Sequence, residues 1–212
     1  MSDYSDYIDE FSHEERLARS EKILEPSQMI SMYLSGAFPM ADSKDSEIVE
    51  WFEPKEHCII PLDNYNIPRS LKKYMREHKF ELYSNRDFPG VLAGCSDREE
   101  TWLSERLKRA YTPLYNSGFI RTVEVYEKEV LVGGLYGLSL FGVFLGESMF
   151  SKKPQASKVA FAHLIKHLEY QGFSLLDVQL HNPHLEMFGA KNIDHATYFK
   201  LLEQGLNSTA RF

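Results

Sequence analysis

The chain has 212 residues, of which 43% are hydrophobic and 13% aromatic, a composition that argues against disorder and allows one substantial core or a main domain with a small appendage. No apolar stretch is long enough to cross a bilayer, and the acidic start lacks the basic and apolar regions of a signal peptide. The formal net charge of −7 speaks against a nucleic-acid partner, but residues 1–25 carry eight acids against three basic side chains, or −5, which leaves −2 for residues 26–212. This nearly neutral remainder can still present a local basic patch to an anion.

Helix and turn signals dominate the first 118 residues. Residues 1–25 are predicted to form a polar, partly helical lead-in, and Pro26 and Ser27 should begin a short helix that ends at Met32 or Leu34, before Gly36. The patterns then predict a loop at 35–43, a short strand at 57–62, a helix at 67–79, a helix or glycine-broken loop at 87–97, and a helix within 101–118 that is limited by Pro113.

From residue 119 the composition shifts to β-branched and aromatic residues. The patterns predict three antiparallel strands at 120–126, 129–138 and 141–147, with tight turns at Glu127–Lys128 and Ser139–Leu140. A helix at 155–172, a strand at 173–180 and a helix from His195 to Gln204 should follow. This order indicates an α+β domain in which helices cover the faces of a mixed sheet.

The stretch FSLLDVQLHNPH, at 173–184, places an acid and an amide two positions apart in an otherwise apolar strand. Residues i and i+2 of a strand share a face, so Asp177 and Gln179 are predicted to project side by side. One interpretation is an edge strand whose polar pair faces solvent. The other is a functional crevice, because the same face is apolar at Phe173 and Leu175 and becomes polar at the carboxyl end of the strand. The pattern alone leaves both open.

A second polar stretch, GESMFSKKPQASK at 146–158, joins a strand to a helix. A loop that leads into a helix can bind anions through free N–H groups, and this one carries Ser151, Ser157, Lys152, Lys153 and Lys158. A solvated helix cap is the alternative. Gly146 is the only glycine from 146 to 171, so the glycine-rich pyrophosphate loop of coenzyme A-dependent acetyltransferases is missing and a coenzyme A site is not supported. Glu147 ends an apolar strand and is expected to face the crevice near Asp177.

Basic residues recur every three or four positions in RSLKKYMREHK, at 69–79, and share one side of the predicted helix: Arg69, Lys72, Lys73, Arg76 and Lys79. This basic stripe can follow phosphates, although a solvated helix face is the commoner meaning of such a run. Trp102 and Tyr33 are candidates to stack on a base, but tryptophan and tyrosine more often serve a core.

The histidines and cysteines show no spacing typical of a metal site. His181 and His184 have no acidic or cysteine partners at a suitable distance in the sequence, and Cys58 and Cys95 have no pairing pattern. We therefore expect no metal, no disulfide framework and a cytoplasmic protein.

Five stretches, taken in chain order, resemble the leucyl/phenylalanyl-tRNA–protein transferase family. They are YLSGAFPM (33–40), SDREETW (96–102), VEVYEKEVLVGGLYGLSLFGVFLGESMFS (123–151), QASK (155–158) and DVQLHNPHLEMFGAKNI (177–193). The resemblance runs from about Ile30 to Leu202, and the combination of these motifs is highly specific.

The resemblance implies an N-acetyltransferase-like mixed sheet with flanking helices, plus a small N-terminal domain. The corresponding division is an acidic lead-in at 1–25, a small N-terminal domain at 26–62 and a catalytic domain at 63–212. It also implies a cofactor-free enzyme that moves leucine or phenylalanine, with methionine as a third donor, from its tRNA to the N-terminal α-amine of proteins beginning with arginine or lysine. The product is marked for degradation. We expect a monomer that acts without a membrane.

The same resemblance assigns site residues. Asp177 and Gln179 match the catalytic pair, with Asp177 expected to hold the side-chain NH₂ of Gln179. The pocket for the donor side chain is implied at Leu135, Phe144, Phe161, Leu164 and Leu176. Further substrate-binding positions are Tyr33, Trp102, Gly146, Glu147 and Asn182. The basic stripe matches the region that binds the tRNA acceptor stem.

Two alternatives remain at this point. The first is an acyl-CoA-dependent N-acyltransferase of similar fold, against which the missing pyrophosphate loop counts. The second is a non-catalytic relative that binds tRNA or peptides, because Met40 stands where many family members have tryptophan and because 53–57 and 193–196 lack the family's arginines. The presence of both Asp177 and Gln179 counts against this second alternative.

Overall fold

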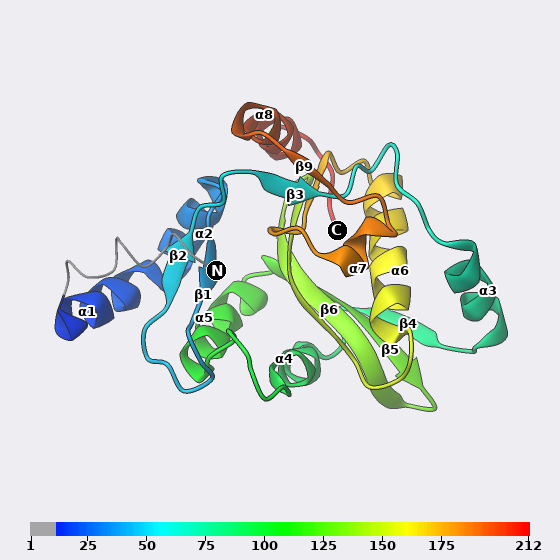
Figure 1. The fold of residues 1–212 in the computed structure, drawn as a ribbon, viewed down its shortest axis with the longest axis horizontal. Helices are drawn as coiled ribbons and strands as arrows, with labels where there is room; N and C mark the ends of the chain where they lie inside the picture. Colours follow the sequence, from blue (N-terminus) through cyan, green and yellow to red (C-terminus); the bar gives the residue numbers. More distant parts are fainter. Residues whose placement is uncertain (1–11) are drawn as a thin grey trace. The chain divides into compact units, whose positions relative to one another are not determined.

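The computed structural model describes residues 12–212, which fold as two compact units. One unit comprises 12–53 and 99–113, and the other comprises 54–98 and 114–212. Figure 1 traces the elements of each unit along the chain. The first eleven residues of the acidic lead-in lie outside the described part, and the expected division at 25/26 and 62/63 stays a prediction. None of the helices within 12–212 is both long and apolar enough to span a membrane.

The first unit contains α1 (His13–Ile23), α2 (Pro26–Leu34), β1 (Phe38–Met40), β2 (Glu50–Phe52) and most of α5 (Glu105–Asn116). Ser12 and Glu15 form a reciprocal capping box at the start of α1. In α2, Pro26 occupies the first turn and the N-cap is Glu25 rather than Ser27. The loop predicted at 35–43 is wrong in its middle, because β1 pairs antiparallel with β2 and Phe38 stacks on Phe52 across the strands.

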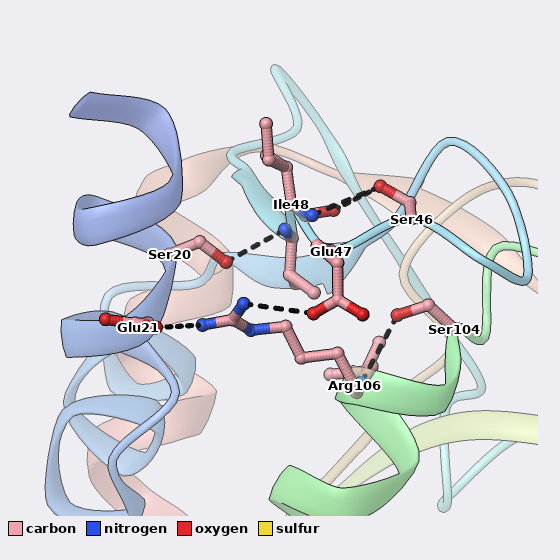
Figure 2. A network of polar contacts seen from close by, with 9 residues as sticks. Ser20, Glu21, Ser46, Glu47, Ile48, Ser104 and Arg106 are labelled. Carbon is pink, nitrogen blue, oxygen red and sulfur yellow. Dashed lines mark hydrogen bonds and ion pairs between the residues drawn. The ribbon is translucent and has the colours of Figure 1, made fainter. Parts of the chain in front are cut away.

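A polar network joins three segments of this unit, as Figure 2 shows. The guanidinium of Arg106 lies 3.4 Å from the carboxylate of Glu21 and 3.3 Å from that of Glu47. The Ser20 hydroxyl accepts a 2.9 Å hydrogen bond from the Val49 amide, which satisfies a buried backbone donor. Arg106 thereby connects α5 to α1 and to the segment that leads into β2.

Pro113 does not limit the helix predicted within 101–118, which continues through it to Asn116. A proline inside a helix removes one backbone hydrogen bond and costs about 3 kcal/mol. Here the apolar face of α5 continues past it: Leu107, Tyr111 and Leu114, spaced by four and three residues, are all fully buried. Burial of this stripe outweighs the local cost.

The second unit is built around one mixed sheet, and its strands are β3 (His57–Ile59), β4 (Glu81–Ser84), β5 (Ile120–Glu127), β6 (Val130–Leu140), β7 (Val143–Ser151), β8 (Leu175–Asp177) and β9 (Lys191–Ile193). Among the described residues the strand order is β4-β5-β6-β7-β8-β3-β9. Strands β7 and β8 are parallel and the other neighbours antiparallel. The helices are α3 (Arg69–Glu77), α4 (Phe88–Ser96), α6 (Ala156–Tyr170), α7 (Pro183–Glu186) and α8 (His195–Leu206). The α+β prediction of a mixed sheet with flanking helices is confirmed.

Helices α4 and α6 cover opposite faces of the sheet at β6 (Figure 1). Adjacent residues of a strand point to opposite faces. A side chain at Gly133 would meet Ala156 of α6 at 2.5 Å, whereas one at Gly134 would meet Val91 of α4 at 3.3 Å. These two glycines therefore allow both helices to approach β6 closely.

The predicted hairpin turns lie too early in the sequence. The β5–β6 turn is formed by Lys128 and Glu129, both with positive φ (50° and 63°), and Phe141 with φ 52° lies between β6 and β7. Residues in the left-handed conformation match the right-handed twist of a tight hairpin. Both turns therefore form where the chain adopts this conformation, one or two residues after the predicted positions. The strand predicted at 173–180 is also too long, because β8 ends at Asp177.

Candidate active site at the end of β8

Asp177 is the last residue of β8 and lies between two neighbouring strands. It pairs with Leu145 of β7 on one side and Ile59 of β3 on the other, and its side chain is only 4% exposed. Burial raises the pKa of the Asp177 carboxyl to about 6, while hydrogen bonds from Gln179 and Tyr198 act in the opposite direction. At pH 7 the carboxyl is therefore mostly ionised, and each of its two oxygens accepts a hydrogen bond.

Gln179 leaves the strand in the left-handed conformation, with φ 65°. Its backbone N–H donates a 2.7 Å hydrogen bond to Asp177 Oδ1, which closes an Asx-type turn. Its carbonyl oxygen accepts a 3.2 Å bond from the Cys58 amide of β3. Asp177 thus fixes the backbone of Gln179 rather than holding its side-chain amide, which corrects both that expectation and the side-by-side arrangement on a regular strand.

The side-chain amide of Gln179 is held by Glu147. Nε2 of Gln179 donates a 3.1 Å hydrogen bond to Oε1 of Glu147, a residue that is 8% exposed. Glu147 owes its position to a β-bulge: Gly137 pairs with Gly146 and Tyr136 with Ser148, so Glu147 is the extra residue between them. Bulges redirect a side chain at such positions. Within residues 12–212 the side-chain carbonyl oxygen of Gln179 makes no hydrogen bond and can accept one from a substrate.

A second set of residues supports Asp177 from α8 and β3. The hydroxyl of Tyr198, a fully buried residue, donates a 2.9 Å hydrogen bond to Asp177 Oδ2. The Tyr198 ring stacks face to face on the imidazole of His57, with 3.5 Å between centroids and 9° between planes. Burial lowers the pKa of His57 to about 4, and His195 acts in the same direction, so His57 is neutral at pH 7. The two stretches that lack the family's arginines meet here, because the rings of His57 and His195 lie 4.9 Å apart.

The five residues assigned to the donor pocket all lie in the hydrophobic core of the second unit. Leu135, Phe144, Phe161, Leu164 and Leu176 are buried members of one cluster on β6, β7, α6 and β8. Leu176 directly precedes Asp177 in β8, so their side chains point to opposite faces of the sheet. Gly146 lies beside the same strand, since a side chain there would come within 3.3 Å of the Asp177 carbonyl oxygen.

The remaining assigned positions are distributed over the chain. Asn182 caps α7, where its Oδ1 accepts a 2.9 Å bond from the His184 amide. Tyr33 and Trp102 belong to the first unit: Tyr33 is buried and its hydroxyl lies 3.0 Å from that of Tyr111, whereas Trp102 is half-buried and its carbonyl oxygen accepts from the Ala41 amide.

Four residues of the basic stripe lie on the exposed side of α3, and the fifth, Lys79, follows the end of this helix. All five are exposed, while Leu71 is buried and Tyr74 packs against the core on the opposite side. Lys73 and Glu77 approach to 3.7 Å, a separation worth little at such an exposed site. The stripe is therefore available to a ligand in solution.

Sequence reasoning missed Tyr198 and His57. Tyr198 lies 21 positions after Asp177, and His57 lies 141 positions before Tyr198, on which it stacks. No local sequence pattern therefore connects either residue to Asp177. Sequence reasoning also assigned Glu147 without the bulge that directs it. A hydroxyl-bearing residue in an otherwise apolar helix face was the one available signal for Tyr198.

Comparison with known proteins identifies the family of this chain. The family model for leucyl/phenylalanyl-tRNA protein transferase matches residues 59–203, which include all of β7, β8 and most of α8. Proteins named leucyl/phenylalanyl-tRNA–protein transferase are similar to this chain in Ruegeria sp. (43% identity over 87% of this chain and 88% of the relative) and Dinoroseobacter shibae (40% over 88% and 84%). Among solved structures, L-PGS from Bacillus licheniformis is 13% identical, with a TM-score of 0.43 over 75% of this chain and 52% of that one. On its match to the family model and to these relatives, the chain belongs to the leucyl/phenylalanyl-tRNA–protein transferase family.

Proposed function

We propose that this protein transfers leucine or phenylalanine, with methionine as a third donor, from aminoacyl-tRNA to the N-terminal α-amine of proteins that begin with arginine or lysine. The observation that carries the proposal is the hydrogen-bonded row Glu147–Gln179–Asp177–Tyr198, which leaves one acceptor atom, Oε1 of Gln179, open to a substrate. The modified protein would carry a destabilising N-terminal residue and be directed to degradation.

The reaction is the aminolysis of an ester. An N-terminal amine has a pKa of about 7.7–8.0, so a useful fraction is neutral at cellular pH without a strong base. The Gln179 carbonyl oxygen accepts one N–H of this amine and orients its lone pair towards the ester carbonyl. A C–N bond forms, the bond from the carbonyl carbon to the ribose oxygen breaks, and the proton finishes on that oxygen. Because an amide is a very weak base, Gln179 orients the amine, while Glu147 and Asp177 orient Gln179.

Donor selection would depend on the apolar cluster in the core of the second unit. A leucine or phenylalanine side chain gains by burial against Leu135, Phe144 and Leu176, whereas a β-branched side chain is widest next to its backbone and meets the walls. Phe161 and Leu164 of α6 would close the far side.

The tRNA would be held by its phosphates. The basic stripe on α3 suits an acceptor stem, since phosphate contacts position a nucleic acid without reading its sequence. Tyr33 and Trp102 stay proposed substrate-binding residues of the first unit. We propose a cofactor-free monomer in the cytoplasm, where aminoacyl-tRNA and reduced thiols occur together; Cys58 and Cys95 are both buried and free.

The test is transfer of radiolabelled leucine from charged tRNA onto a peptide with N-terminal arginine, with an N-terminal alanine peptide as the acceptor control. Label on the arginine peptide alone supports both the reaction and the acceptor specificity. Absence of label with leucyl-, phenylalanyl- and methionyl-tRNA would refute the proposal. A parallel coenzyme A binding assay separates the transferase from an acyl-CoA-dependent enzyme, which would bind that cofactor.

A further inference from the structure

A groove of about 760 Å³ lies in the second unit, where β7 ends and α6 begins. It is lined by residues from the end of α4 (Gly94, Asp97, Arg98), from β7 and the following loop (149–155), from the first turn of α6 (Ser157, Lys158) and by Asn182 and His184. This volume lies in the upper part of the range of small-molecule sites, so the groove has room for more than one phosphate group.

The charges along this groove are predominantly positive. Four cationic side chains line it, Arg98, Lys152, Lys153 and Lys158, against the single carboxylate of Asp97. Arg98 donates to a backbone carbonyl and Lys153 pairs with Glu127 at 3.2 Å. Within the described residues, Lys152 and Lys158 form no ion pair. A concave surface of one sign concentrates an oppositely charged ligand.

The first two amides of α6 are bonded within the chain. The Ala156 amide bonds to the carbonyl oxygen of Lys153, and the Ser157 amide bonds to Ser151 Oγ at 3.1 Å. These two amides are therefore not available to a ligand. The main attraction of the groove for an anion comes from the lysine side chains that line it.

Two residues that line the groove are close along the chain to residues of the candidate active site. Asn182, on its wall, follows Gln179 by three residues, and Met149 follows Glu147 by two residues along the same strand, a separation of about 7 Å. On another side the groove borders α3, the helix that carries most of the basic stripe, because the Tyr74 hydroxyl on the core-facing side of α3 donates a 2.8 Å hydrogen bond to the carbonyl oxygen of Pro154. The groove thus lies between the reacting groups and the helix proposed to hold the acceptor stem.

We propose that this groove binds the backbone phosphates of the single-stranded 3′ end of the aminoacyl-tRNA, with Lys152 and Lys158 as the ion-pairing residues. The inference rests on the proposed function, which supplies the RNA. Phosphates held here would fix the ester beside Gln179 for any tRNA sequence, because such contacts position without specifying. The pyrophosphate of coenzyme A shares this chemistry and is the alternative source of the anion.

The first experiment measures binding of leucyl-tRNA and of a 5′-phosphorylated CCA trinucleotide between 50 and 200 mM salt. In the double variant Lys152→Ala/Lys158→Ala, the slope of log K against log salt should be less steep by about 1.4, since each lysine contributes about 0.7 on a single strand. Over this fourfold salt range the wild-type affinity should then fall about sevenfold more than that of the variant.

The control variant is Lys166→Ala. Lys166 is exposed on the same helix, about 12 Å along its axis from Lys158, and carries the same charge. It should keep the wild-type slope, as should Lys152→Arg/Lys158→Arg. An unchanged slope in the alanine double variant, or an equal change in Lys166→Ala, would overturn the inference. So would coenzyme A binding at lower concentration than the trinucleotide in a competition assay.

A kinetic comparison separates this inference from the proposed function. Leucyl-adenosine carries the ester but no phosphate, so the ratio of kcat/KM for leucyl-tRNA to that for leucyl-adenosine should fall in the double variant and stay at the wild-type value in Lys166→Ala. If the wild type transfers leucine from neither donor while RNA binding still depends on Lys152 and Lys158, the proposed reaction fails and the groove assignment stands. If the ratio does not change while transfer proceeds, the groove assignment fails.

Discussion

Replacement of Tyr198 by phenylalanine tests the arrangement around Asp177. The change removes one hydroxyl and keeps the ring that stacks on His57. A hydrogen bond to a charged group contributes about 1.5–3 kcal/mol, which corresponds to about 1–2 units in the acceptor's pKa. Because the Tyr198 bond lowers the pKa of Asp177 from where burial alone would put it, its loss should raise that pKa from about 6 to between about 7 and 8.

The consequence is a pH-dependent loss of activity. With a pKa of about 6, roughly nine-tenths of Asp177 is ionised at pH 7; with a pKa of about 7.5, roughly a quarter is. In the variant only the Gln179 N–H still donates to Asp177, and a protonated carboxyl accepts this bond more weakly than a carboxylate, so the anchor of Gln179 is weakened. The variant should therefore transfer about fourfold more slowly than the wild type at pH 7 and reach the wild-type rate near pH 9.

The assay is the ratio of variant to wild-type kcat at each pH from 5.5 to 9. Ionisation of the acceptor amine affects both enzymes equally and cancels in this ratio. Tyr65→Phe is the matched control, since the Tyr65 hydroxyl also donates to a carboxylate, that of Glu169 at an exposed site. A ratio that is constant with pH would refute the reasoning and leave Tyr198 with a packing role alone.

Further predictions concern chemistry, stability and tRNA binding. Gln179→Ala should reduce transfer by about 100-fold or more while tRNA binding persists, because the amine loses its orienting acceptor; near-normal turnover in a single-turnover assay would remove Gln179 from the mechanism. His57 is neutral in the fold but protonated below pH 6.5 when unfolded, so it withdraws stability as the pH falls from 6.5 towards 4. In His57→Phe, the difference in unfolding free energy between pH 7 and pH 5 should shrink by about 2 kcal/mol, measured by urea titration, and an unchanged difference would contradict the low pKa. Lys72→Ala with Arg76→Ala should flatten the salt dependence of tRNA binding by about 1–2 in slope, and an unchanged slope would make the stripe a solvated face. Gly133→Ala should destabilise the protein by about 1–3 kcal/mol, because its methyl group would lie 2.5 Å from the first residue of α6; thermal unfolding at the wild-type temperature would show that this helix can shift freely.

Much of the second unit could be predicted from local patterns. The helix at α6 has apolar residues at helical spacing and a terminal Gly172, which indeed adopts a positive φ. Helix α3 lies within the predicted range 67–79, although it begins at Arg69, directly after Pro68, and ends at Glu77. The antiparallel strands β5 to β7 follow from β-branched and aromatic composition; the errors lie at the two turns and at the end of β7, which runs to Ser151 instead of 147. These features depend on neighbours within a few positions of the chain, so the sequence alone is sufficient.

The family could also be recognised from the sequence, because side-chain identity and motif order carry it, and the same motifs single out Asp177 and Gln179 as the candidate pair. The hydrogen-bond partners of the individual atoms of this pair could not be predicted from the sequence. The Asp177 carboxylate accepts a hydrogen bond from the backbone N–H of Gln179 because β8 ends at Asp177. The Glu147 carboxylate accepts one from the side-chain amide of Gln179 because Glu147 is the extra residue of a β-bulge in β7. Both outcomes depend on how separate strands register with one another.

The contacts that hold Asp177 in place are visible only in the tertiary structure. Tyr198 reaches Asp177 from the C-terminal helix, and His57 stacks on Tyr198 from a strand that precedes it by 141 positions. The pKa values of about 6 for Asp177 and about 4 for His57 arise from burial, which is a property of the packed fold and not of the residue. Sequence thus determined which chemical groups this protein possesses, and packing determined their charge, their orientation and their partners, because these depend on distances that only the folded chain defines.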